Sequence, residues 1–145
     1  MTTTPLYEKI LIAADGSEKN RAAVSEAIRI AHACGAAVVA VYVQDLGAIE
    51  SLPPGEMLLK DTWSVIQNEA ESTLARIRSM AEGVALTTVV LEGKPAPEIV
   101  RYAKENTIDL IVIGTQGKRG LERLLLGSVA ESVIRSAPCK VLIVK

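Results

Sequence analysis

Short apolar runs alternate along this chain with segments whose apolar residues recur every three or four positions. The runs at 10–14, 38–43, 84–91, 108–113 and 141–144 are too short for helices. Most are apolar throughout, which is typical of strands buried on both faces of a sheet. Strands that alternate with helices are joined by right-handed crossovers and lie parallel. The alternation therefore predicts an α/β fold with a doubly wound, five-stranded parallel sheet.

Helices are predicted between these strands. Spacings of four, three and four place Ala23, Ala27, Ile30 and Cys34 on one face of a helix that ends near Gly35. Further helices are predicted over 66–81, around 97–103, where Pro97 suits a first turn, and after Gly127. A chain of 145 residues, 49% of them hydrophobic, has the size of one domain, so we expect a single domain over 1–145.

Residues 44–60 interrupt the alternation. They contain Pro53-Pro54-Gly55 and show no periodicity, which predicts a long loop. Loops of this length are often functional lids, but simple surface excursions are also common, and both interpretations stay open.

Composition excludes several classes of protein. The 16 Lys and Arg nearly balance the 17 Asp and Glu, and aromatic residues are 3% with no Phe, so neither the charge nor the stacking surface of a nucleic-acid binder is present. No apolar run approaches the roughly 18 residues of a membrane span, and the start MTTTPLYEK does not resemble a signal peptide. We therefore expect a cytoplasmic protein with no nucleic-acid or membrane partner.

The cysteines and the histidine do not indicate a metal site. Cys34 and Cys139 are far apart, with no CxxC pattern, and are predicted to be small core residues. His32 falls on the polar side of its helix and is predicted to be solvated.

The segment after the fourth predicted strand, GTQGKRGLERLLLGSVAE, carries most of the candidate chemistry. Ligands of an open α/β sheet bind beyond the carboxyl ends of the strands. Glycines let backbone amides approach phosphate oxygens, the helix that opens at Gly127-Ser128 adds a positive dipole, and Lys118, Arg119 and Arg123 add charge. The alternative is a flexible loop before a helix capped by Ser128 and Glu131, since Ser-x-x-Glu is a capping box.

Known phosphate loops do not match this segment. The Walker pattern needs Ser or Thr after Gly117-Lys118, where the chain has Arg119. The dinucleotide pattern would have to follow the first strand, which ends AADGS.

The spacing G-x2-G-x9-G-[S/T] does match, at Gly114, Gly117, Gly127 and Ser128. With the opening KILIAADGS, the strand DLIVIGTQG and the close LLLGSVAESVIRSAPCKVLIVK, the chain resembles the ATP-binding branch of the universal stress protein family over its whole length. The resemblance implies a Rossmann-like sheet in the order 3-2-1-4-5 that binds ATP across strands one and four.

The resemblance also implies the residues of the site. They are Ala13, Ala14 and Asp15 at the nucleoside, the backbone of Val43 at the adenine edge, Ile113 and Gly114 at the ribose, and Gly117, Gly127, Ser128, Val129 and Ala130 at the phosphates. Three positions depart from common family choices: Ala14 lacks a hydroxyl, Gln116 replaces a His or Arg, and Ala130 lacks a side-chain oxygen.

The carboxylates near the strand ends allow more than one role. Without the family, Asp15 before Gly16-Ser17 is most simply a turn residue. With it, Asp15 is expected at the nucleotide, directly or through a metal. Mg²⁺ would be bound mainly by the phosphates of ATP rather than by a set of protein ligands. Asp45 either helps to bind that ion or is a solvated loop residue.

Three functions remain open from the sequence: a stress-response regulator that binds ATP as a ligand switch, a slow Mg²⁺-dependent ATPase, and a dimeric interaction module that needs no nucleotide. No residue is placed as a catalytic base. The resemblance implies a homodimer through antiparallel pairing of the last strand, which consists of Val141, Leu142, Ile143 and Val144.

Overall fold

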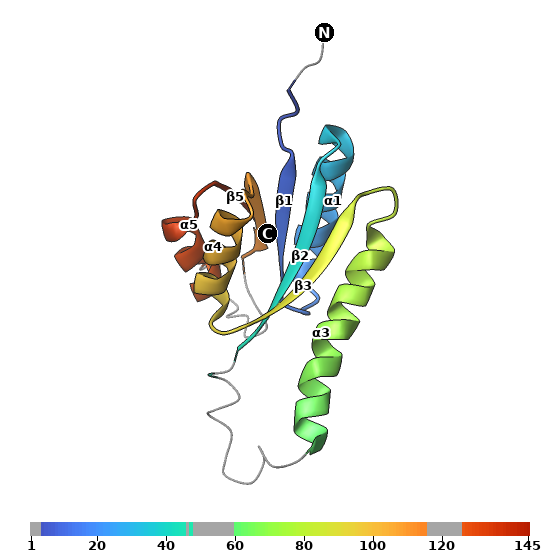
Figure 1. Ribbon diagram of the computed structural model, residues 1–145, viewed down its shortest axis with the longest axis vertical. Coiled ribbons are helices and arrows are strands. Elements are labelled where there is room, and N and C mark those ends of the chain that lie inside the picture. Colours follow the sequence, from blue (N-terminus) through green and yellow to red (C-terminus); the bar gives the residue numbers. More distant parts are fainter. Residues whose placement is uncertain (1–3, 46, 48–59, 116–125) are drawn as a thin grey trace.

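The computed structural model describes residues 4–45, 47, 60–115 and 126–145 of the chain. Five parallel strands form one sheet in the order β3-β2-β1-β4-β5, with helices on both faces (Figure 1). The predicted fold class and strand order are therefore confirmed. The strands are β1 (Lys9–Ala14), β2 (Ala37–Gln44), β3 (Leu86–Glu92), β4 (Leu110–Gly114) and β5 (Lys140–Val144), and the helices are α1 (Asn20–Cys34), α3 (Lys60–Met80), α4 (Pro95–Glu105) and α5 (Ser128–Ser136).

The central strand β1 is buried on both faces. Ile10, Ile12 and Ala14 belong to a core cluster with α1 and α3, and Leu11 and Ala13 belong to a second cluster with α4 and α5. None of these five side chains is more than 9% exposed. Because both faces are covered, the strand has no polar alternation, as the sequence predicted.

Two predicted strands begin later than expected. The amide of Val84 donates to the Ala81 carbonyl in the turn after α3, and β3 starts only at Leu86. Likewise, the amide of Ile108 donates to the Ala103 carbonyl, and β4 starts at Leu110. Apolar residues that close a helix end look the same in sequence as the first residues of a strand, which explains both differences.

The helix α3 begins at Lys60, six residues before the apolar period at Ile66 predicted its start. At the other end of the predicted loop, β2 extends through Gln44, whose carbonyl accepts the amide of Gly93 at 3.0 Å. The rest of that loop falls mainly on residues 46 and 48–59, which lie outside the described residues.

Both cysteines lie at the margins of the core rather than inside it. Cys34 is the last residue of α1 and Cys139 directly precedes β5, so each is half-buried, and the prediction of buried core residues was wrong in degree. Burial, with a smaller contribution from the Asp109 carboxylate, raises the pKa of the Cys139 thiol. His32 is exposed, as predicted, and its Nε2 lies 3.1 Å from the carbonyl oxygen of Glu82.

None of the helices within the described ranges is long and apolar enough to cross a membrane.

Candidate functional site

The turn after β1 is shaped by the side chain of Asp15. Its Oδ1 accepts hydrogen bonds from the amide of Ser17 at 2.8 Å and from the Ser17 hydroxyl at 2.7 Å. Gly16 between them has a φ of 80°, a left-handed conformation that glycine adopts without strain. The turn role considered for Asp15 is therefore present. Its other oxygen, Oδ2, has no hydrogen-bond partner among the described residues, and Asp15 as a whole is half-buried at the strand end.

Asn20 holds this turn against the end of β1, and the sequence-based prediction missed it. The side chain is only 4% exposed. Its Nδ2 donates to the Ala13 carbonyl at 2.9 Å, and its Oδ1 accepts the amide of Asp15 at 3.4 Å. A signal was present in the sequence, since Asn20 lies three residues before Ala23 and so extends the apolar face of α1 with a polar residue.

Replacing Asn20 with Ala is expected to lower the free energy of unfolding by about 1–3 kcal/mol, because the buried carbonyl of Ala13 would lose its side-chain donor. Denaturant unfolding measures this loss. The control is Ser25→Ala, an exposed position on the same helix that should change stability by less than about 0.5 kcal/mol. Equal effects of the two substitutions would contradict a role for Asn20 in holding the turn.

A second set of hydrogen bonds brings the start of α5 to the end of β4. Thr115, which follows β4, donates its amide to the Val144 carbonyl at 3.2 Å and accepts the amide of Gly127 at 2.6 Å. Gly127 is the N-cap of α5, and the first helical hydrogen bond runs from the Glu131 amide to the Gly127 carbonyl at 2.9 Å. The helix therefore starts beside the carboxyl edge of the sheet.

Three backbone donors at the start of α5 have no acceptor among the described residues. They are the amides of Ser128, Val129 and Ala130, which precede the first helical hydrogen bond. Together with the helix dipole, such amides favour an anionic group.

The capping box considered for Ser128 does not form. Ser128 is the first helical residue rather than the N-cap, so its hydroxyl is not positioned to accept an amide of the first turn, and it is exposed. The partner of Glu131 is Arg135, at 2.7 Å between Oε1 and the guanidinium. Gly127, with φ −59° and ψ 156°, occupies the capping position without a side chain.

The strand order brings most of the predicted site residues to one edge. Pairing of Ile12 with Val112 sets the ends of β1 and β4 side by side, so Ala13, Ala14 and Asp15 lie next to Ile113 and Gly114. Val43 is half-buried near the end of β2, on the other side of β1. Gln116, Gly117, Lys118, Arg119 and Arg123 lie outside the described residues.

The described side chains at this edge do not form a protein cage for a metal. Asp45 is half-buried, and its Oδ1 accepts the amide of Gly47 at 2.9 Å. Within 4–45, 47, 60–115 and 126–145, no three His, Cys, Asp or Glu side chains gather where they could hold an ion. The donors available at this edge are thus mainly backbone amides, which suit phosphate oxygens.

Solved structures similar to this chain share its fold and in some cases hold a nucleotide. The universal stress protein UspA from Lactobacillus plantarum is 30% identical, with a TM-score of 0.80 over 96% of this chain and 98% of the other. A universal stress protein from Archaeoglobus fulgidus in complex with dAMP is 28% identical, with a TM-score of 0.68 over 97% and 99%. A universal stress protein in complex with cAMP is 25% identical, with a TM-score of 0.67 over 95% and 96%.

Sequence comparison agrees with these structures. A universal stress protein of Methanocaldococcus jannaschii, MJ0531, is 46% identical over 97% of this chain and 83% of its own length. The model of the universal stress protein family matches residues 6–145. The chain belongs to the universal stress protein family.

Proposed function

We propose that this protein binds ATP with Mg²⁺ at the carboxyl edge of β1 and β4. It acts in the cytoplasm as a homodimeric regulator of the stress response that is switched by this ligand, and residues 1–145 form one domain. The observation that carries the proposal is the set of three amides at the start of α5 that have no acceptor among the described residues. They point a positive dipole toward the edge where open α/β sheets bind their ligands.

Relatives support an adenine nucleotide as the ligand. The similar structures with dAMP and cAMP each hold an adenine base and one phosphate group. In this chain Ala13, Ala14 and Ile113 at the ends of β1 and β4 are buried and apolar, and their backbones would border the nucleoside. The amides of Ser128, Val129 and Ala130, with Gly117 and Gly127 from the motif, would hold the phosphates, and the backbone of Val43 would select adenine over guanine.

Mg²⁺ fits the site as an ion bound chiefly by the phosphates. Bound in this way, it neutralises phosphate charge and keeps several waters. The protein group best placed to approach it is the Oδ2 of Asp15, since Oδ1 already accepts two hydrogen bonds from Ser17.

The direct test is to denature the purified protein, recover the released small molecules and identify them by mass. ATP or its hydrolysis products at a stoichiometric level would support the proposal. If the protein carries no nucleotide and calorimetric titration with ATP and Mg²⁺ gives no heat of binding, the proposal fails. GTP in the same titration tests the selectivity assigned to Val43.

We expect hydrolysis of bound ATP to be slow, below roughly 1 s⁻¹, the low end of ordinary enzyme turnover. Groups that hold ground state and transition state equally give affinity without acceleration, and we expect the amides at the start of α5 to act in this way. Efficient phosphoryl transfer adds a positioned cation worth roughly 10³ to 10⁵ in rate. Single-turnover measurement with labelled γ-phosphate checks this. A faster rate that is lost in Arg119→Ala or Arg123→Ala would identify an ATPase instead.

The homodimer should form through β5, the outer strand next to β4 in the sheet order. Its residues Val141, Leu142, Ile143 and Val144 are apolar and only half-buried, and exposed strand edges pair readily. Light scattering should give twice the chain mass at micromolar concentration. The carbonyl of Val144 accepts Thr115 on the β4 side, and its amide points to the same side, so the free edge is lined by the alternate residues. Ile143→Pro therefore removes one amide donor from the free edge and should shift the equilibrium toward monomer. A monomeric unmodified protein would contradict the prediction.

A further inference from the structure

Two arginines stand apart from the other arginines of the described chain. The guanidinium of Arg21 on α1 has no hydrogen bond or ion pair with the described residues, and that of Arg76 on α3 makes only a 3.5 Å contact with the Gly16 carbonyl, at the limit of a hydrogen bond. The other described arginines all pair with carboxylates: Arg29 with Glu26, Arg78 with Glu71, Arg101 with Glu98 and Glu105, and Arg135 with Glu131.

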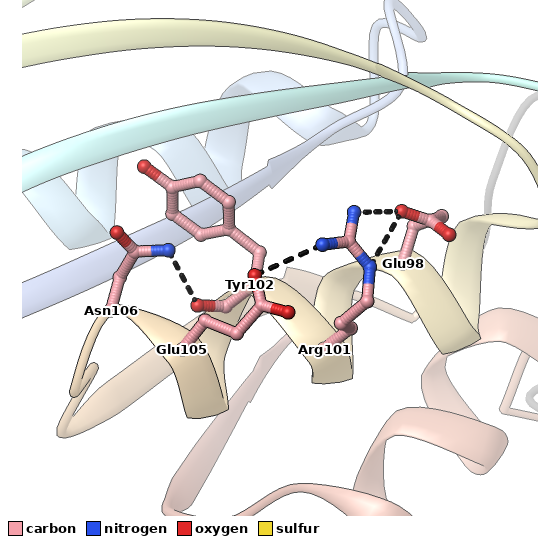
Figure 2. Close-up of polar contacts among 5 residues, drawn as sticks. All are labelled: Glu98, Arg101, Tyr102, Glu105 and Asn106. Atoms are coloured by element: carbon pink, nitrogen blue, oxygen red, sulfur yellow. Dashed lines mark hydrogen bonds and ion pairs between the residues drawn. The ribbon is translucent and has the colours of Figure 1, made fainter.

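Arg101 illustrates the usual arrangement on this surface. Figure 2 shows its guanidinium between Glu98 and Glu105, one turn away on either side along α4. Hydrogen bonds to Glu98 and then Glu105 raise the pKa of Arg101 above its ordinary value. Among the residues that the structure describes, no carboxylate pairs with Arg21 or Arg76 in this way, so their guanidinium groups are available to an anion from solution.

Both arginines line the same cavity, of about 30 Å³, between the start of α1 and the middle of α3. Ser17, Asn20 and Thr73 add polar groups to its wall, and among the described lining residues Glu18, which is exposed, is the one acidic side chain. The first turn of α1 contains no acidic side chain, unlike those of α4 and α5, and Glu18 lies just before it. The cavity is therefore a net positive site.

The cavity is shallow, with a volume of about 30 Å³, or roughly two water positions, and it is open to solvent on one side. It therefore suits a small anion such as phosphate, whose inner oxygens reach the arginines while the outer ones stay in water. Arginine is also the side chain whose planar fork best matches phosphate oxygens.

We infer that this cavity is an oxyanion site that binds a phosphate group through Arg21 and Arg76. It is separate from the proposed nucleotide site, because α1 and α3 cover one face of the sheet and α5 covers the other. Ser17 and Asn20 line the cavity and also hold Asp15 by hydrogen bonds, so an anion bound here contacts the back of the turn that borders the nucleotide site.

The test is titration of the full-length protein with inorganic phosphate at constant ionic strength, followed by amide chemical shifts in NMR. Saturable shifts are expected at 17–21 and 73–77. Arg21→Gln and Arg76→Gln should each weaken phosphate binding at these amides about tenfold, since each removes charge-assisted hydrogen bonds. Both positions are exposed, so the variants should fold.

The matched control is Arg29→Gln, which removes the same charge from the same helix but away from the cavity. It should leave phosphate binding within about twofold, since exposed charges act weakly over such distances in salt. Shifts confined to 128–130, absence of saturable shifts at 17–21, or equal weakening by Arg29→Gln would each overturn the inference. Because the readout uses phosphate alone and separate amides, it does not depend on whether ATP binds.

Discussion

Saturating ATP with Mg²⁺ is expected to raise the free energy of unfolding by about 4 kcal/mol when free ligand is roughly a thousandfold above its dissociation constant. For a chain of this length each kcal/mol moves Tm by about 2–4 °C, so the thermal shift should be about 10 °C. Gly127→Val should abolish it. The backbone of Gly127, at φ −59° and ψ 156°, suits valine, and the amide that donates to Thr115 is kept. The added side chain would instead block the approach to the amides of Ser128 and Val129.

Ser132→Val is the control for that experiment. It places the same side chain on the exposed side of α5, beyond the first turn and its three available amides. Its shift with ATP should match that of the unmodified protein. No shift in the unmodified protein, or the same shift in Gly127→Val, would show that the start of α5 does not hold the phosphates.

Truncating either of two neighbouring residues in β1 should be about equally costly. Leu11 and Ile12 are both 0% exposed, but they belong to core clusters on opposite faces of the sheet. Leu11→Ala and Ile12→Ala are each expected to lower the free energy of unfolding by about 2–5 kcal/mol, because each loses buried apolar surface and leaves a cavity. Denaturant unfolding gives both values.

Val90→Ala provides the comparison for these variants. Val90 lies in the outer strand β3 and is 39% exposed, so its truncation should cost less than about 1 kcal/mol. In a sheet covered on one face only, one of the two β1 variants would resemble Val90→Ala. That result would contradict the arrangement of helices on both faces.

The candidate site was predictable where it depends on backbone and on local spacing. Gly114 could be placed at the end of an apolar strand and Gly127 before a helix. The family resemblance of the motif then predicted which neighbouring residues belong to the site. Asn20 was missed because it acts through hydrogen bonds to the Ala13 carbonyl and from the Asp15 amide. The sequence around a single Asn does not show which groups its side chain will contact. The predicted capping box does not form because either Ser128 or Gly127 can occupy the N-cap position of α5, and Gly127 occupies it. The hydrogen bond from the Gly127 amide to the Thr115 carbonyl fits this arrangement.

The sequence by itself determined the types of the elements and the doubly wound class, since apolar period and strand length act over a few neighbouring residues. It did not determine where β3 and β4 begin, because helix ends and strand starts share the same apolar residues. The tertiary structure alone decided that Arg21 and Arg76, 55 positions apart, line one cavity and that neither guanidinium forms an ion pair with a described residue. Such pairings depend on how helices pack across a sheet, and that packing follows from the whole core rather than from any local pattern.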